Sequence, residues 1–193
     1  MRIPTTLFAA VLCAAGLGMA QAQTSNVAPT GGSKIPAGIS FAYDEAHGHL
    51  TTTGVQLATV TNQQHLNVFS GTITVTININ VVSNFGPHTR IGCSANAIGG
   101  LIDLAQGGIQ GGIETANGRA KMTGPGTAVC TLTIPYTWTI SQSNTAVEGV
   151  IIGFAAAARN EEGDVIRSTT QADGILSLPS NGASTSYTFG VSL

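Results

Sequence analysis

The sequence predicts an all-β fold, a single-domain and mostly antiparallel β-sandwich of immunoglobulin-like architecture. Two long stretches alternate between β-branched or aromatic residues and threonine or asparagine, which is the two-residue period of a half-buried strand. Turns rich in glycine and asparagine separate the stretches, and no segment keeps a capped 3.6-residue apolar period. Strands of unequal length and spacing favour a sandwich over a barrel.

Residues 1–22 predict an export signal. Arg2 is positively charged, residues 3–19 are uncharged and mostly apolar, and Ala20-Gln21-Ala22 matches the pattern that signal peptidase reads. Cleavage after Ala22 leaves a polar, flexible arm over residues 23–33 and one domain over residues 34–193. No later stretch is long and apolar enough to span a membrane. We therefore expect an exported protein that is periplasmic, at the cell surface or extracellular.

The first predicted strand covers residues 35–43. Its apolar residues alternate with polar or small ones, so one face of the strand is apolar: Ile35, Ala37, Ile39, Phe41 and Tyr43. Pro36 cannot donate a ladder hydrogen bond, which favours an edge or terminal strand.

The clearest strand patterns lie in residues 71–82 and 129–140. In the first, isoleucine and valine form one face, and threonine and asparagine the other. In the second, one face carries Cys130, Leu132, Ile134, Tyr136, Trp138 and Ile140. Such β-branched alternation is typical of a strand with one face in a core.

Four further strands complete the prediction. A short one covers residues 91–97, and residues 147–158 are apolar enough to be buried on both faces. Asn160-Glu161-Glu162-Gly163 predicts a hairpin turn into a strand over residues 164–170. The chain ends on an alternating strand over residues 187–193.

Residues 99–126 are rich in glycine and contain three Gly-Gly pairs. Asn117-Gly118 is the strongest two-residue hairpin signal. We expect either a hairpin or a mobile loop here. A phosphate-binding loop is excluded, because neither glycine spacing of the known nucleotide motifs is present.

Cys93 and Cys130 remain after signal cleavage, since Cys13 lies in the signal. An even number of cysteines in an exported chain predicts one disulfide bond. Both cysteines lie on the apolar phase of their strands, so we expect the bond to be buried and to stabilise the domain.

Charged residues make up 8% of the chain, against about 25% in a typical soluble domain. The net charge is −2, and no basic patch is present to bind nucleic acid or an anionic bilayer. A weakly charged surface repels its own copies little, which suits a self-associating protein. The alternative is that a low lysine content is simply usual for exported proteins.

His47 and His49 form the sharpest candidate site, for a metal ion. Two residues apart on a strand, they would point to the same face and could share one metal. His65 or His88 is a possible third ligand, and Asp44 or Glu45 could ligate or orient an imidazole. The alternative is a polar turn at Gly48 with solvated histidines.

No pattern in the sequence supports an enzyme. Tyr136 and Trp138 could stack on a sugar, but they share their face with apolar residues, which favours a core position. Glu161, Glu162 and Asp164 lie beside a glycine turn, where carboxylates are normally solvated. Nucleophile-elbow and metalloprotease motifs are absent.

The two ends of the chain carry one-sided apolar strands, as subunits that assemble by strand addition do. With one disulfide and an alternating C-terminal strand, the chain loosely resembles chaperone-assembled pilins in architecture and termini. It departs from them at Ser192, where they have an aromatic residue, and in its mid-chain cysteine pair. The resemblance implies a homo-oligomer formed by strand addition; the alternative is that both strands pair within their own domain.

The sequence therefore predicts a non-enzymatic, exported domain that works by binding or self-assembly at the cell surface or outside the cell, like a fibre subunit or adhesin. Two alternatives stay open. One is a module for carbohydrate or another ligand, with residues 99–126 as a binding loop. The other is a periplasmic metal-binding protein that uses His47 and His49. No cofactor is predicted.

Overall fold

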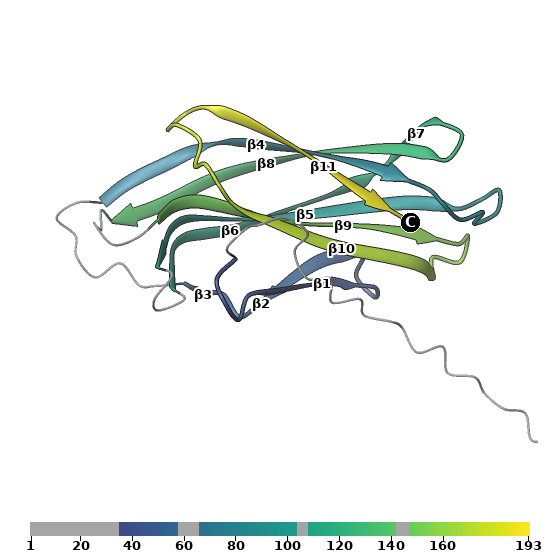
Figure 1. The fold of residues 1–193 in the computed structure, drawn as a ribbon, viewed down its shortest axis with the longest axis horizontal. Helices are drawn as coiled ribbons and strands as arrows, with labels where there is room; N and C mark the ends of the chain where they lie inside the picture. Colours follow the sequence, from purple (N-terminus) through teal and green to yellow (C-terminus); the bar gives the residue numbers. More distant parts are fainter. Residues whose placement is uncertain (1–34, 58–65, 104–107, 142–146) are drawn as a thin grey trace, which may run out of the picture.

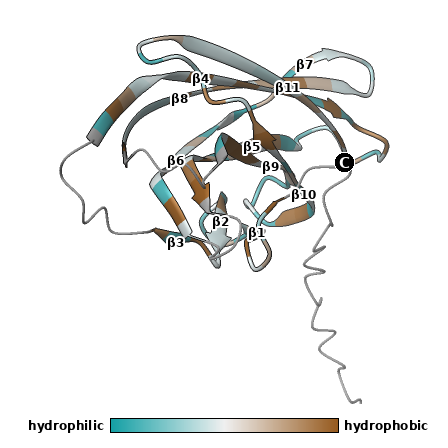
Figure 2. Ribbon diagram, turned by 60° about the vertical axis from the view of Figure 1, so that its left-hand side comes forward, coloured by the Kyte–Doolittle hydropathy of each residue, from teal (hydrophilic) through white to brown (hydrophobic). Residues whose placement is uncertain are grey.

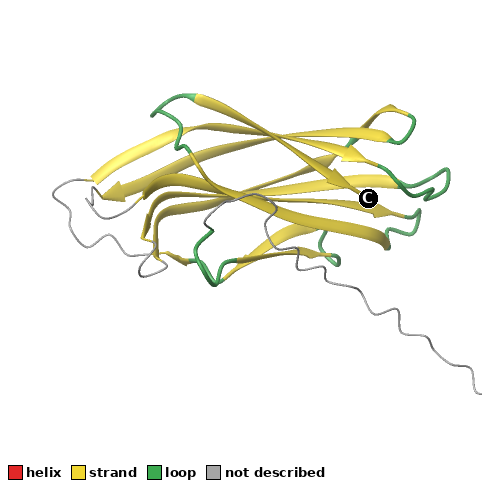
Figure 3. Cartoon of the chain, viewed as in Figure 1, coloured by secondary structure: helices red, strands yellow, loops and turns green. Residues whose placement is uncertain are grey.

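The computed structural model describes residues 35–57, 66–103, 108–141 and 147–193. The predicted signal peptide (1–22) and arm (23–33) lie outside these ranges, and so does His65. The described chain consists of strands joined by loops and turns (Figure 3). Among the described residues there is no helix long and apolar enough to cross a membrane.

The predicted β-sandwich is confirmed: two sheets pack face to face, and a hairpin lies beneath one of them (Figure 1). The five-stranded sheet has the order β10-β9-β5-β6-β3: Val165–Leu176, Val147–Arg159, Arg90–Asp103, Gly108–Arg119 and Gln56–Leu57. The four-stranded sheet has the order β11-β4-β8-β7: Ser184–Ser192, Leu66–Asn80, Thr127–Ser141 and Lys121–Gly124. The hairpin is formed by β1 (Ser40–Asp44) and β2 (His49–Thr53). Of the strand pairs that the structure describes, only β11–β4 and β3–β6 are parallel.

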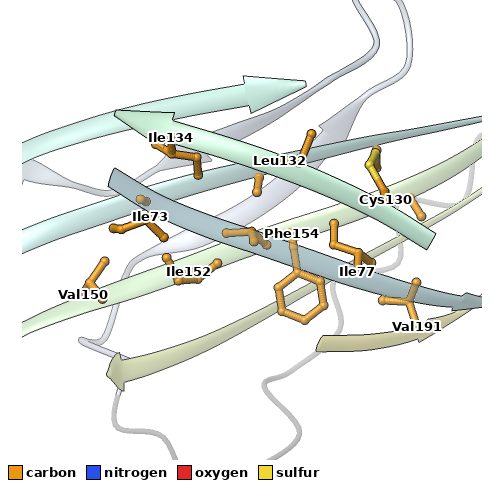
Figure 4. Close-up of a cluster of buried hydrophobic side chains, with 14 of the residues drawn as sticks. Ile73, Ile77, Cys130, Leu132, Ile134, Val150, Ile152, Phe154 and Val191 are labelled. Carbon is orange, nitrogen blue, oxygen red and sulfur yellow. A yellow bond between two sulfur atoms is a disulfide. The ribbon is translucent and has the colours of Figure 1, made fainter. Parts of the chain in front are cut away.

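The core between the sheets follows the two predicted alternating stretches. β4 and β8 pair antiparallel over fifteen positions, from Leu66 opposite Ser141 to Asn80 opposite Thr127. The inward residues of both strands are at most 3% exposed: Ile73, Val75, Ile77, Ile79, Cys130, Leu132, Ile134, Tyr136, Trp138 and Ile140. Figure 4 shows several of them with the residues of β9 that they face. The assigned phase of both strands is therefore correct.

β9 is buried on both faces, as predicted, because it lies second from the edge of its sheet and is covered from below. Ile152, Phe154 and Ala156 belong to the core between the sheets. Ala155 and Ala157 face the other way and pack with residues of the β1–β2 hairpin. Hydrophobic residues accordingly colour β5 and β9 in the middle of the molecule (Figure 2).

The β1–β2 hairpin is held on the outer face of the five-stranded sheet by a buried polar contact with β5. The Leu50 amide donates to Ser94 Oγ at 2.8 Å, and Asn96 Nδ2 donates to the Leu50 carbonyl at 3.1 Å and to Thr52 Oγ1 at 2.8 Å. The strand begins at Ser40 rather than at residue 35, because residues 36–39 form a turn closed by the Ile39 amide on the Pro36 carbonyl.

In the glycine-rich segment the predicted turn at Asn117-Gly118 is wrong, whereas residues 99–103 and 108–112 pair antiparallel, as the hairpin alternative predicts. The described part of this segment, 99–103 and 108–126, is mostly strand, and the strand predicted over residues 91–97 extends to Asp103. Asn117-Gly118 lies inside β6, opposite Ser94 and Cys93, and is not a hairpin. A Cβ built on Gly118 would lie 2.8 Å from Leu132 Cδ2 and 3.7 Å from Cys130 Sγ. The glycine is therefore explained by close packing against β8.

The Gly-Gly pairs serve the core in the same way. Gly99 and Gly112 are opposite each other, and a Cβ on either would run into the Trp138 ring. Gly100 and Gly111, also opposite each other, have φ of +134° and +151°, which L side chains rarely adopt. β5 and β6 bend at this end of the sheet (Figure 1), so the glycines accommodate both the indole ring and the bend.

The predicted disulfide bond joins Cys93 on β5 to Cys130 on β8. It therefore links the two sheets across the core, and both cysteines are at most 2% exposed. The closed loop spans 37 positions of the sequence.

Candidate functional site

Charged side chains gather at one end of the sandwich. The structure describes five basic residues, and each lies at or near the end of a strand on this side of the molecule: Arg90, Arg119, Lys121, Arg159 and Arg167. The ladders bring three of them together, since Arg90 pairs with Arg159, and Gly92, two positions further along β5, lies opposite Arg119.

The candidate metal site lies in the β1–β2 turn at this end. His47 Nδ1 donates to Asp44 Oδ2 at 2.7 Å, and the Asp44 carboxylate also accepts from the amides of Ala46 and His47. These hydrogen bonds, first of all that of the His47 side chain, lower the pKa of Asp44. The ring centroids of His47 and His49 are 5.8 Å apart. The geometry orients His47 with Nε2 available.

The other proposed ligands do not join this pair. His88, in the loop between β4 and β5, pairs instead with Glu161 at 3.1 Å, and His65 lies outside the described residues. Glu45 is turned toward β10, where Ser168 Oγ lies 3.5 Å from its Oε1. In the described ranges no three histidine, cysteine or acidic side chains come close enough to hold a metal together.

Arg159 ties the turn to the sandwich. Its guanidinium donates to the Glu45 carbonyl at 2.7 Å and to the Gly163 carbonyl at 2.6 Å, and it lies 5.9 Å from the centre of the Tyr43 ring. The charged end is thus partly a structural clamp between the β1–β2 and β9–β10 turns.

The aromatic pair and the acidic turn have structural positions. Tyr136 and Trp138 stack with ring centroids 4.3 Å apart inside the core, and burial raises the pKa of Tyr136. They offer no exposed platform to a sugar. Asp164 accepts from Asn160 Nδ2 at 3.2 Å within the β9–β10 turn, and Glu162 is exposed.

A shallow hollow of about 720 Å³ lies where the ends of β4, β8 and β11 meet β7 and β10, and no charged residue lines it. Its polar lining consists of amides and hydroxyls: Asn78, Asn80, Thr123, Thr127, Thr169, Gln171 and Ser192. Such a lining matches a neutral, hydrogen-bonding ligand.

The feature that sequence reasoning missed is the backbone edge of β6. The Ala120 amide donates to the Ile91 carbonyl at 2.9 Å, and the same register runs through the whole β5–β6 ladder without a shift. Even-numbered residues of β6 therefore bond to β5, and odd-numbered ones point N–H and C=O the other way. The backbone N–H and C=O groups that point away from β5 belong to Ile113, Thr115, Asn117 and Arg119. We call this stretch, residues 113–119, the β6 edge.

Within the described ranges no strand pairs with the β6 edge, since β3 reaches only Gly108 and Ile109. The neighbouring edge, on β8, differs. The Thr72 amide donates to the Ala183 carbonyl, away from β8, so Pro135, opposite Thr72, has its nitrogen on the open side of β8. Proline at such a position blocks strand addition. The β6 edge contains no proline.

Comparison of the chain with protein-family models, with curated proteins and with solved structures found no match.

Proposed function

We propose that this chain is a non-enzymatic, exported domain that assembles by strand addition at the cell surface or outside the cell, as fibre subunits do. The β6 edge is the acceptor: an extended strand from another chain adds to it and continues the five-stranded sheet.

The observation that carries the proposal is the contrast between the two edges on this side of the sandwich. Natural sheets protect open edges with proline, charge, bulges or short strands. β8 has Pro135 on its open side, and β10 has two register irregularities. The β6 edge has a regular ladder behind it and only Glu114 and Arg119 as charges. The low overall charge adds support, because copies of the chain repel one another weakly.

The test compares two variants at one position. Thr115→Pro removes a backbone N–H from the β6 edge and leaves the β5–β6 ladder bonds intact, while Thr115→Ala keeps the N–H. Residues 23–193, made in an oxidising compartment, are followed by size-exclusion chromatography with light scattering over a wide concentration range. We expect wild type and Thr115→Ala to assemble and Thr115→Pro to stay monomeric at an unchanged Tm. Wild-type protein that stays monomeric at every concentration contradicts the proposal.

Metal binding is the second candidate function, favoured by the Asp44–His47 hydrogen bond, which fixes an imidazole as carboxylates do for metal ligands. Zn²⁺ should then raise the Tm of wild-type protein and leave the Tm of His49→Ala unchanged. His88→Ala is the matched control, and zinc should raise its Tm as it does in wild type. An equal Tm shift in wild type and His49→Ala would show that zinc binds elsewhere.

A further inference from the structure

The C-terminal strand β11 has a second open edge. Among the described strands it pairs with β4 alone, in parallel and without a register shift. The Leu193 amide donates to the Asn80 carbonyl at 2.9 Å, and Leu193 accepts from the Val82 amide at 2.7 Å. Odd-numbered residues therefore bond to β4, and even-numbered ones point N–H and C=O outward. The outward residues, which form the β11 edge, are Ser184, Ser186, Thr188, Gly190 and Ser192.

The β11 edge also lacks protection. It contains no proline and no charged residue, and it is nine residues long, or about 30 Å at the usual rise per residue. The β6 edge is about 23 Å long by the same measure, so the two edges can pair along the full length of the shorter one.

The two edges lie on opposite sides of the sandwich. β6 packs over β8 on one side, and β10 approaches β11 on the other. A contact between unlike edges on opposite sides cannot close within a pair of copies. It leaves one β6 edge and one β11 edge free at the ends, so further copies add, into an open chain or, where the rotation between copies closes, into a ring.

We propose that the partner of the β6 edge is the β11 edge of a second copy of this chain, so that copies join head to tail. This inference rests on the proposed function, because it names the strand that adds. It differs from a pairing of two β6 edges, which would give a closed dimer, and from addition of the N-terminal arm.

The unlike pairing requires fewer charged side chains to lose water at the seam. The β6 edge carries Glu114 and Arg119, and a symmetric pair of such edges would place four charged side chains along one seam. The β11 edge brings none, so only two charged side chains lie along the mixed seam.

The experiment uses two blocking variants of residues 23–193, each with a control. Ser186→Pro removes an outward N–H from the β11 edge, and Thr115→Pro removes one from the β6 edge; Ser186→Ala and Thr115→Ala keep theirs. Each proline variant alone should be monomeric by light scattering. Mixed in equal amounts, they should form a dimer and stop there, because one intact β11 edge and one intact β6 edge remain to meet.

A measurement on unaltered protein keeps the inference testable if a proline variant does not fold. A synthetic peptide of residues 184–193 should occupy the β6 edge of wild-type protein and shorten its assemblies seen by electron microscopy. A peptide of the same composition in scrambled order should leave their length unchanged.

The outcomes separate the inference from the proposed function. Wild-type assembly that Ser186→Pro and the peptide leave unchanged overturns the head-to-tail pairing but leaves strand addition at β6 standing. Dimers of Ser186→Pro alone indicate pairing of two β6 edges and also overturn it. Wild-type protein that never assembles overturns both.

Discussion

β6 and β8 face each other across one side of the sandwich, and they differ in the size of their core side chains and in the protection of their edges. β8 sends large side chains into the core and places Pro135 on its open side. β6 sends small residues toward β8, among them Gly112, Ala116 and Gly118, and no described strand pairs with its edge at residues 113–119. The large side chains of β8 leave room only for small residues at these facing positions of β6. The comparison teaches that packing explains the glycines of β6 but not its unprotected edge, which in our proposal accepts a strand from another chain.

The largest expected effect of a single substitution is on β8. Trp138 is 1% exposed and rests on Gly99 and Gly112, so Trp138→Ala should lower the free energy of unfolding by ~3–5 kcal/mol. The cost should fall in the lower part of that range, because Trp138 Nε1 is buried without a hydrogen-bond partner among the described residues. Urea unfolding followed by circular dichroism measures it.

The control for this prediction is Thr137→Ala, one position away on the exposed face of β8, which should cost about 0.5 kcal/mol or less. Equal costs at the two positions would mean that the packing between β8 and β6 is not as described.

Enlarging a small residue of β6 tests the same packing from the other side. Gly118→Val places a side chain against Leu132 and Cys130, and overpacking of this kind costs about 1–3 kcal/mol. Gly190→Ala on β11 is the matched control, because nothing lies within 4 Å of a Cβ built there. Thermal unfolding should show a lower Tm for Gly118→Val alone; a similar Tm in both variants would indicate that β6 and β8 pack loosely.

The disulfide bond links β8 to the opposite sheet, through β5. A bridge that closes a loop of 37 positions contributes about 4 kcal/mol in the chain-entropy description. Its loss in Cys93→Ala/Cys130→Ala should therefore cost about as much as the loss of the indole ring. Urea unfolding of the double variant measures it, and an unchanged unfolding midpoint would mean that the bond does not hold the sheets together.

The smallest effect on stability is expected at Pro135. Pro135→Thr restores an outward N–H on β8, at an exposed position, and should change the free energy of unfolding by no more than about 0.5 kcal/mol. Its association should increase, as measured by light scattering, because a second edge on the same side becomes open. A large loss of stability with no gain in association would show that Pro135 serves the fold and not the edge.

The same two strands show how far the sequence predicts the structure. β8 could be predicted because its inward residues repeat every two positions and are all large or apolar. β6 could not, because Gly112 and Gly118 are small to fit Trp138 and the disulfide bond, which are distant in sequence, and glycine carries no hydrophobic period. Asn117-Gly118 has a strong local turn signal, which the β5–β6 ladder overrides.

The candidate sites divide in the same way. The Asp44–His47 contact is local in sequence, and the sequence names Asp44, beside Glu45, as a residue that could ligate a metal or orient an imidazole. The separation of His88 from His47 depends on loops that meet only in the folded chain. The open edges of β6 and β11 depend on strand order, which periodicity does not contain, and so they became visible only with the ladders.

Residue-resolved amide hydrogen exchange tests the central claim most directly. In dilute, monomeric protein the amides of Thr115 and Asn117 should exchange fast, while those of Glu114 and Ala116, bonded to β5, should be protected. On assembly the amides of Thr115 and Asn117 should become protected as well, together with those of Ser186 and Thr188 on β11. Protection of all four β6 amides in the monomer, or fast exchange of Thr115 and Asn117 in the assembled protein, would contradict the claim that the β6 edge is the open acceptor.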